Sequence, residues 1–229
     1  MSRKCMIILP LLLILSLNSI QALAMETGFS TDEMPIEEAE EFVSARSLKL
    51  LEKEPRKKEF ACFDVNPEHK IAVAYLRNNK GYVCVYAEGK FLYGYCFNAS
   101  KFFAIEWAGD NLNILFSTQI MSVTPKGEVI DVAIVNKSVE NNTLRSHLSI
   151  GEKRTVDNIT YTIHRAFLAP AYSKIVATDS NGNETVLYNV SGEQIWSTVP
   201  WIVFGVLFAA FVLYRVICIN KRKNKLNVI

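Results

Sequence analysis

The longest apolar pattern in the chain lies near its C-terminal end. Residues 199–219 read VPWIVFGVLFAAFVLYRVICI, in which Arg215 is the one charged residue. A helix of that length rises about 30 Å, the thickness of the hydrocarbon core of a bilayer. The pattern therefore predicts a transmembrane helix over 199–219. A buried helix of a soluble protein is the alternative, but such helices are seldom so long and so uniformly apolar.

The residues around this run predict its orientation. Trp196 and Trp201 lie at its start, where indole rings favour the membrane–water interface. Arg215 lies about one turn from its end, near enough for the side chain to reach the headgroups. Four cations follow the run: Lys221, Arg222, Lys223 and Lys225. Residues 220–229 are therefore expected to form a basic cytoplasmic tail, with the larger N-terminal part outside the cell.

The first 24 residues show the pattern of a secretory signal peptide. Arg3 and Lys4 precede the apolar stretch MIILPLLLIL, and small residues follow at Ala22 and Ala24. This order is typical of a cleaved signal. We expect residues 1–24 to be removed after Ala24.

Residues 25–58 are predicted to form a helical lead-in between Pro35 and Pro55. Acidic residues are early in this stretch and basic residues late, the order that the helix dipole favours. The apolar positions recur at helical spacing: Ile36, Ala39, Phe42, Val43, Leu50 and Leu51. The acidic run DEMPIEEAEE is interpreted as a solvated helix face, and an acidic binding patch is the alternative.

From residue 59 to 195 the pattern changes to short apolar runs separated by turn residues. FACFDV, IAVAY, YVCVYA and KFLYGYCF follow one another closely and are rich in β-branched and aromatic residues. Such runs predict β-strands. Because IAVAY is apolar at every position, that strand is expected inside a sheet rather than at its edge.

Three segments share a strand–turn–strand pattern: Tyr82–Tyr93, Ile120–Asp131 and Ser173–Tyr188. Gly89 and Gly127 lie in the turns of the first two, 38 residues apart. The third contains an Asn-Gly pair, a strong hairpin signal. A period near 40 residues with short strands is typical of propeller blades.

This pattern resembles the blades of bacterial extracytoplasmic β-propeller repeat proteins. The whole chain is also similar to poorly characterised single-pass membrane proteins of Gram-positive bacteria. The resemblance implies a mostly β fold of about three propeller-like antiparallel repeats after one amphipathic helix. Closed propellers usually have four or more blades, so we expect either an open β structure or copies that associate as a homo-oligomer. A β-sandwich is the competing fold.

Charge is divided unevenly along the chain. The net charge of +2 includes seven cations in or beside the two apolar ends, which leaves 18 of the 25 Lys and Arg against all 23 Asp and Glu. The intervening part is therefore mildly acidic, which argues against a nucleic-acid partner.

Three cysteines lie in this part: Cys62, Cys84 and Cys96, whereas Cys5 and Cys218 belong to the apolar ends. An odd number gives no complete disulfide framework. A bond between Cys62 and Cys84 is one arrangement, and buried free thiols are the other.

Candidate catalytic groups are few and scattered. The residues considered are three histidines and three strand carboxylates: His69, His147, His164, Asp64, Glu106 and Asp131. None has a partner at metal-ligand spacing, and no spacing pairs two carboxylates. The sequence predicts no metal, no cofactor and no catalytic site.

Aromatic residues are more suggestive. Alternation in FLYGYCF places Phe91, Tyr93, Tyr95 and Phe97 on one face, and Trp107 follows nearby. Aromatic side chains are common in β cores, which is the favoured interpretation. A binding face formed by Phe91, Tyr93, Tyr95 and Trp107 is the alternative.

Together these patterns predict a single-pass protein of the cell membrane that presents a β-rich interaction or sensing domain outside the cell. Its expected partners are the lipid bilayer and another membrane or envelope protein. A membrane-tethered hydrolase or carbohydrate-active enzyme, which would need a cleft with paired carboxylates, is one alternative. A structural subunit of an envelope complex is the other.

Overall fold

The computed structural model describes residues 25–101, 103–165 and 172–226, without the side chains of residues 150, 193–198 and 216–226. The predicted signal peptide lies outside the described residues. So do the side chains of Trp196, Cys218 and the basic tail. The structure is 46% strand, and its described residues form three helices and several antiparallel sheets, none of them closed. The prediction of a mostly β fold is confirmed.

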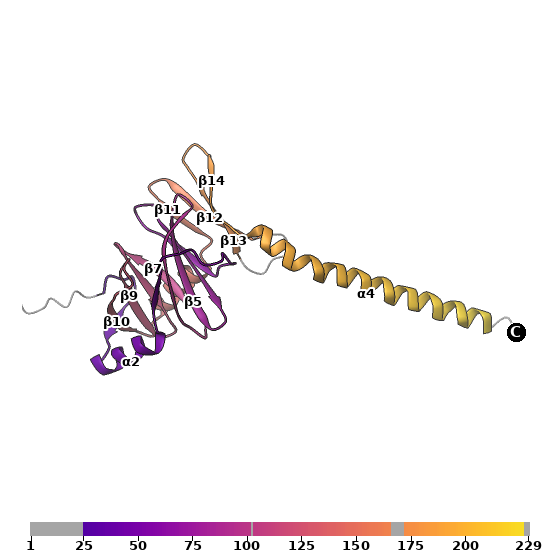
Figure 1. Cartoon of the computed structure of the whole chain (residues 1–229), viewed down its shortest axis with the longest axis horizontal. Helices are drawn as coiled ribbons and strands as arrows, with labels where there is room; N and C mark the ends of the chain where they lie inside the picture. The colour runs from indigo at the N-terminus through magenta and orange to yellow at the C-terminus, as the bar shows by residue number, and fades with distance from the viewer. Residues whose placement is uncertain (1–24, 102, 166–171, 227–229) are drawn as a thin grey trace, which may run out of the picture.

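Three antiparallel sheets make up the body (Figure 1). The first contains β3 (Cys62–Val65), β4 (Ile71–Arg77), β5 (Lys80–Ala87) and β6 (Lys90–Asn98), with β2 (Lys49–Leu51) beside β6. The second contains β7 (Ala104–Ala108), β8 (Asn111–Leu115), β9 (Gln119–Val123) and β10 (Val129–Val135), with β1 (Thr31–Glu33) beside β10. The third contains β11 (Lys153–Val156), β12 (Ile159–Arg165), β13 (Tyr172–Thr178) and β14 (Glu184–Asn189).

Each sheet contains a meander of four strands in chain order. The three segments with matching sequence patterns occupy the same place in their sheets. Tyr82–Tyr93 lies in the β5–β6 hairpin, Ile120–Asp131 in the β9–β10 hairpin and Ser173–Tyr188 in the β13–β14 hairpin. In every case these are the third and fourth strands of the meander.

The first sheet lies between the other two and contributes to two hydrophobic cores. In β4, Ala72 and Ala74 pack toward the second sheet. Ile71, Val73 and Tyr75 pack toward the third sheet. All five residues are buried, and β4 lies between β3 and β5. The expectation that IAVAY is an internal strand is therefore confirmed.

Two hairpin glycines lie where neighbouring sheets meet. Gly89, between β5 and β6, has φ +76° and lies against the backbone of Leu187 in β14. Gly127, between β9 and β10, has φ +82° and lies against Leu50 in β2. Each of these turns thus contacts an outer strand of a neighbouring sheet. A side chain at either position would be strained by the positive φ, and at Gly127 also by the contact with Leu50.

The lead-in is part of the body rather than a separate stalk. It forms β1, α2 (Ile36–Arg46) and β2. The helix is shorter than predicted, because Ser47 adopts a left-handed conformation, φ 47°, and ends it. Leu50 pairs with Tyr95 in a sheet instead of continuing the helix. The ring of Phe42 packs edge-on against that of Phe116 and anchors α2 to the body.

The helix α3 (Val139–Ile150) joins the second sheet to the third. Ser138 caps its first turn by accepting a hydrogen bond from the Asn141 N–H at 3.0 Å. Leu148 is buried in the core beneath the second sheet, with Leu144 packed beside it.

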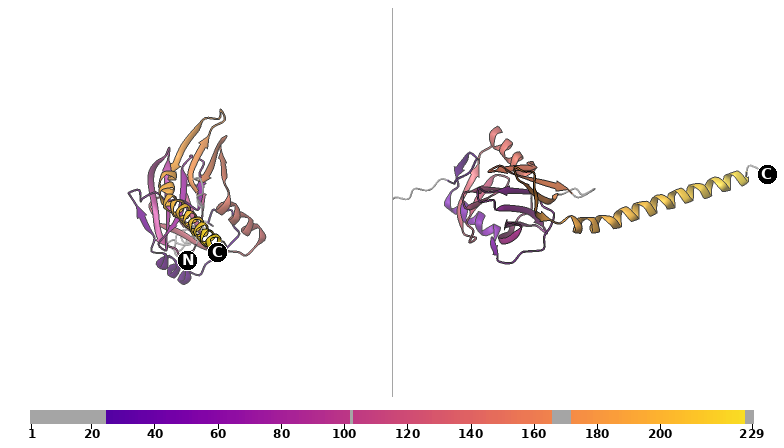
Figure 2. Two further views of the ribbon diagram at one scale, coloured as in Figure 1. Left: turned by 90° about the vertical axis from the view of Figure 1, so that its right-hand side faces the viewer. Right: turned by 90° about the horizontal axis from the view of Figure 1, so that it is seen from above.

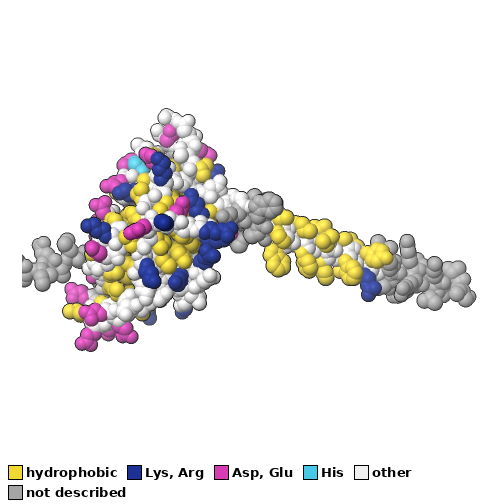
Figure 3. Space-filling model, viewed as in Figure 1, with side chains coloured by type: hydrophobic (Ala, Val, Ile, Leu, Met, Phe, Trp, Pro, Cys, Tyr) yellow, Lys and Arg dark blue, Asp and Glu magenta, His cyan; other side chains and the backbone are white. Residues whose placement is uncertain are grey.

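The helix α4 (Ser191–Leu226) projects away from the body (Figures 1 and 2). Its apolar side chains between Val199 and Tyr214 are exposed, including Trp201 at 75% and Leu207 at 64%. Figure 3 shows them as a continuous apolar surface on the face in view. Among the residues described, no helix combines the length and the apolarity needed to cross a membrane.

Candidate functional site

The first strands of the three meanders, β3, β7 and β11, meet at Asp64. Its Oδ2 accepts a hydrogen bond from the Trp107 N–H of β7 at 2.8 Å. Its Oδ1 accepts one from Arg154 Nε of β11 at 3.3 Å. One buried carboxylate therefore joins one strand from each sheet.

Arg154 extends this network to the helix that precedes it. Its guanidinium donates to the carbonyls of His147 at 3.2 Å and Leu148 at 3.4 Å, at the C-terminal end of α3. It also lies over the Phe63 ring, 5.3 Å from the centroid. Cations are favoured at helix C-termini, where carbonyls lack partners within the helix. Arg154 thus links the third sheet, the first sheet and α3.

Burial raises the pKa of the Asp64 carboxyl, while the Trp107 N–H and the charge of Arg154 act in the opposite direction. The two charged side chains are 13% and 10% exposed. Each of these side chains is hydrogen-bonded to the other and to backbone groups. We therefore interpret the pair as a contact that holds the sheets together rather than as a group that exchanges protons with a substrate.

Glu106 belongs to a separate network on the second sheet. Its carboxylate accepts hydrogen bonds from the Thr27 hydroxyl and from the Gly28 N–H at 3.0 Å. Asn113, opposite it in β8, donates to the Glu26 carbonyl at 2.8 Å. These bonds fasten the segment before β1 to the sheet.

The three carboxylates considered in the sequence analysis each have their own hydrogen-bond partners. Asp64 and Glu106 have different partners, and Asp131 accepts a hydrogen bond from the N–H of its neighbour Val132. Among the described residues, no three His, Cys, Asp or Glu side chains lie together in a way that could hold a metal ion.

The three histidines are dispersed. His147 and His164 are exposed. His69, in the β3–β4 turn with φ 61°, lies 2.8 Å from the Tyr161 hydroxyl and 3.9 Å from Asp157. This cluster joins the first and third sheets at their turns. Burial raises the pKa of Tyr161, which disfavours its phenolate.

The four aromatic residues do not share one face. The pairing of β5 with β6 shifts between Val85 and Tyr86, so Phe91 packs into the core shared with the third sheet. Tyr93, Tyr95 and Trp107 pack into the other core. Tyr95 is fully buried, and its hydroxyl donates to the Thr124 carbonyl at 2.7 Å. The expectation that Phe91, Tyr93, Tyr95 and Phe97 share one face is wrong for Phe91, because the shift reverses the alternation there. Tyr93, Tyr95 and Phe97 do pack into the same core.

Within the described part of the chain, Cys62, Cys84 and Cys96 are free thiols, and Cys62 and Cys84 are buried in different cores. The disulfide considered between them is therefore absent. Burial raises the pKa of each thiol to about 12, so both stay protonated at neutral pH.

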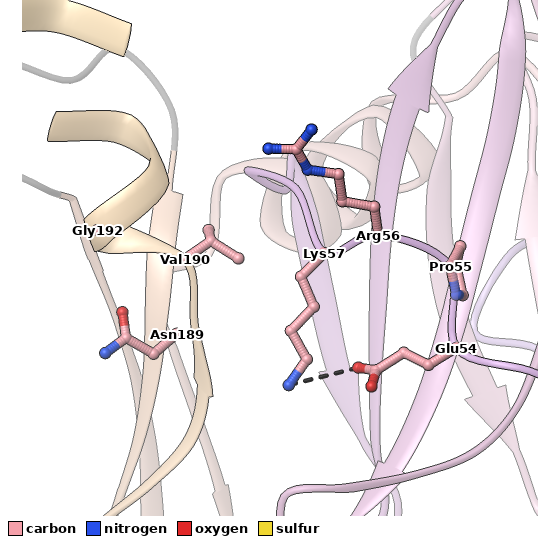
Figure 4. Close-up of a pocket in the computed structure, with 7 residues that line it drawn as sticks. All are labelled: Glu54, Pro55, Arg56, Lys57, Asn189, Val190 and Gly192. Atoms are coloured by element: carbon pink, nitrogen blue, oxygen red, sulfur yellow. Dashed lines mark ion pairs between the residues drawn. The ribbon is translucent and has the colours of Figure 1, made fainter. Parts of the chain in front are cut away.

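A pocket of about 460 Å³ lies at the base of α4 (Figure 4). Two stretches far apart in the sequence line it: Glu54, Pro55, Arg56 and Lys57 before β3, and Asn189, Val190 and Gly192 where β14 leads into α4. Lys57 Nζ lies 3.3 Å from Glu54 Oε1. It also lies 5.3 Å from the centroid of the Tyr86 ring and 5.5 Å from that of the Tyr188 ring.

Sequence reasoning missed both Arg154 and this pocket. Arg154 is 90 residues from Asp64, and no local pattern distinguishes it from other strand cations. The stretch PRKK at 55–58 is visible as a basic run, but its position beside α4 is not. Comparison with protein-family models, with curated proteins and with solved structures finds no match to the chain.

Proposed function

We propose that the chain is a single-pass membrane protein that presents its β body outside the cell as an interaction module without catalytic activity. The observation that carries this proposal is the exposed apolar surface of α4, with Phe208 at 60% and Leu213 at 63%. The apolar run continues in the sequence to Ile219 and is followed by the basic tail. Water disfavours so large an apolar surface, whereas a bilayer accommodates it.

The body is proposed to be an open, propeller-like arrangement of three blades. Three features support this: the shared four-strand meander, the meeting of the first strands at Asp64, and the contacts of Gly89 and Gly127 with neighbouring sheets. The stacking order places the first sheet in the middle, so the second and third sheets form the two ends.

The two ends of the stack differ, which suggests where a partner binds. The second sheet is covered by α3 and by the segment held at Glu106. The outward positions of the third sheet are mostly polar and include Thr155 and Glu184, both exposed, and Val186 at 48%. We infer that a protein partner binds this outer face, because the side chains of Thr155, Glu184 and Val186 on it are exposed and available for contact.

Alkaline extraction of membranes from cells that express the full chain tests the anchor. We expect the wild-type chain to stay with the membrane. A variant with Leu207→Arg, Ala210→Arg and Leu213→Arg should be released, since each central Arg costs about 2.5–3.5 kcal/mol of insertion free energy. Three Arg substitutions at Thr155, Thr160 and Thr162 add the same charge to the body and should leave the chain in the membrane. Release of the wild-type chain would refute the anchor.

Photo-crosslinking tests the binding face. A crosslinker at Val186 should give one adduct of defined mass, while one at Lys126, in the β9–β10 turn, should not. An adduct of twice the chain mass would identify the partner as a second copy. Identical patterns from both positions, or none, would refute the assignment of this face.

A further inference from the structure

The end of the β13–β14 hairpin carries the one Asn-Gly pair of the chain, Asn181 and Gly182. Both residues are exposed, and so are Ser180 before them and Asn183 after them. The hairpin projects from the body (Figure 1). Water therefore reaches the side chain and the backbone of this pair.

The side chain of Asn181 is free to move. Among the described residues, none is hydrogen-bonded to its amide, whereas the Asn183 amide donates to Asp179 Oδ2 at 2.8 Å. A Cβ added at Gly182 would have none of the described atoms within 4 Å. The Asn181 side chain can therefore rotate toward the Gly182 nitrogen without meeting another group.

The turn itself holds the Gly182 nitrogen. Its N–H donates to the Asp179 carbonyl at 3.0 Å, and the Asn181 N–H donates to Asp179 Oδ1 at 2.8 Å. Gly182 has φ +83°, the left-handed conformation that follows a type I turn in three-residue hairpin loops. Exposed hydrogen bonds at a loop tip open at a small cost in free energy. The Gly182 nitrogen is therefore released from time to time while the sheet stays folded.

Once released, this nitrogen can react with the Asn181 side chain. It loses its proton and bonds to Asn181 Cγ, the Cγ–Nδ2 bond breaks, and ammonia leaves. Water then opens the cyclic imide at either of its two carbonyl carbons. One opening gives an aspartyl residue, and the other gives an isoaspartyl residue, in which the main chain runs through the side-chain carbons. The net change is the addition of water and the loss of ammonia, with no oxidant or reductant.

We propose that Asn181 deamidates spontaneously by attack of the Gly182 nitrogen, at a rate set by opening of the turn. The product adds a carboxylate beside Asp179, which is itself charged at neutral pH because the Asn183 amide lowers its pKa. The isoaspartyl form also lengthens the main chain by a methylene, so the pairing of Asp179 with Asn183 must shift. This end of the third sheet thus becomes more acidic as the protein ages. The reaction needs neither the membrane anchor nor a partner.

Asn158 provides a comparison within the same sheet. It lies in the β11–β12 turn, is exposed and has φ 67°. Ile159 follows it, and a β-branched side chain crowds the nitrogen that would have to attack. We expect Asn158 to keep its amide under conditions in which Asn181 loses it.

Peptide mass spectrometry of the full chain, incubated in detergent at neutral pH, tests the site. We expect the peptide that contains position 181 to convert to aspartyl and isoaspartyl forms, with the isoaspartyl form in excess, while the peptide that contains Asn158 stays unchanged. A sample digested without incubation measures the conversion caused by digestion. Folding should slow the conversion by about tenfold at most relative to the chain in urea, since one neutral hydrogen bond holds the Gly182 N–H. No conversion in the folded chain, while the unfolded chain reacts to completion, would overturn the proposal.

Variants at two positions separate the steps. Asn181→Gln should abolish the conversion, because its longer side chain forms a larger ring far more slowly. Asp179→Ala removes the acceptor of the Asn181 N–H and should speed the conversion several-fold, whereas Asp179→Asn keeps an acceptor oxygen and should stay near the wild-type rate. Equal rates in the wild type and in Asp179→Ala would overturn the role of the turn. An aspartyl product without the isoaspartyl form would indicate direct hydrolysis by water and overturn the attack by Gly182.

Discussion

Asp64 is buried in β3 and has partners in two other sheets, Trp107 and Arg154. Removing one member of such a pair leaves the other charge buried without compensation. We expect Arg154→Met to lower the free energy of unfolding by about 3–5 kcal/mol. Urea unfolding of the full chain in detergent, followed by circular dichroism, measures this loss.

The matched double variant, Arg154→Met with Asp64→Asn, should lose much less than the sum of the two single losses, because neither charge then remains. Additive losses would contradict the role of Asp64 and Arg154 as one unit.

The pH dependence of stability tests the environment of Asp64 separately. Burial raises the pKa of its carboxyl above the unfolded value of about 3.9. The folded chain therefore binds this proton more tightly than the unfolded chain does. The contribution to stability is largest below the unfolded pKa and falls as pH rises through the folded pKa.

Asp64→Asn removes that dependence. The free energy of unfolding of the wild type, minus that of the variant, should decline as pH is raised from about 4 toward neutrality. A difference that rises over this interval would mean that Arg154 and the Trp107 N–H outweigh burial.

Residue-level chemistry was only partly visible in the sequence. Asp64 and Glu106 could be recognised as strand carboxylates, but Trp107 lies 43 residues from Asp64 and Gly28 lies 78 residues from Glu106 along the chain. Hydrogen bonds between distant strands depend on how sheets stack, which no local pattern specifies.

At the scale of elements, the hairpin glycines offer a matched pair. Gly127 and Gly182 both have positive φ, +82° and +83°. A Cβ added at Gly127 would lie 3.1 Å from Leu50 Cβ, whereas a Cβ added at Gly182 would have none of the described atoms within 4 Å. We expect Gly182→Ala to cost about 1–2 kcal/mol from the backbone alone. Gly127→Ala should cost more, because β2 must also shift.

Thermal unfolding of the two single variants measures the difference. Equal losses would mean that the β9–β10 turn yields without disturbing its neighbour, and that the contact between the sheets contributes little.

The boundary between α2 and β2 shows why element prediction from spacing was incomplete. Leu50 and Leu51 fit a helical face, yet Leu50 pairs with Tyr95 in β6. Two adjacent apolar residues satisfy a helical and an extended pattern equally well. The edge of β6, available only after the first sheet has formed, favours the strand.

At the scale of the whole molecule, the stacking order predicts unequal local stability. The first sheet contributes to both hydrophobic cores, whereas the described residues of the third sheet contribute to one. We expect the backbone amides of β4 and β5 to exchange most slowly. Those of β11 and β14 should exchange faster, through local unfolding that costs less free energy. Native-state hydrogen exchange of the full chain in detergent measures this order. Slower exchange in the third sheet than in the first would contradict it.

The sequence by itself determined the mostly β character of the body, the internal position of β4 and the three equivalent hairpins. These follow from local hydrophobic alternation and turn chemistry, which each segment carries within itself. It also determined the apolar run of α4, whose place in a membrane stays a prediction.

Only the tertiary structure decided that β1 and β2 complete two sheets, that the pairing shift in β6 turns Phe91 away from Tyr93, and that Arg154 reaches Asp64. It also brought Arg56 and Lys57 to the base of α4. Each of these depends on contacts between segments distant in the chain. Their free energy comes from packing and pairing that exist only once the sheets have stacked.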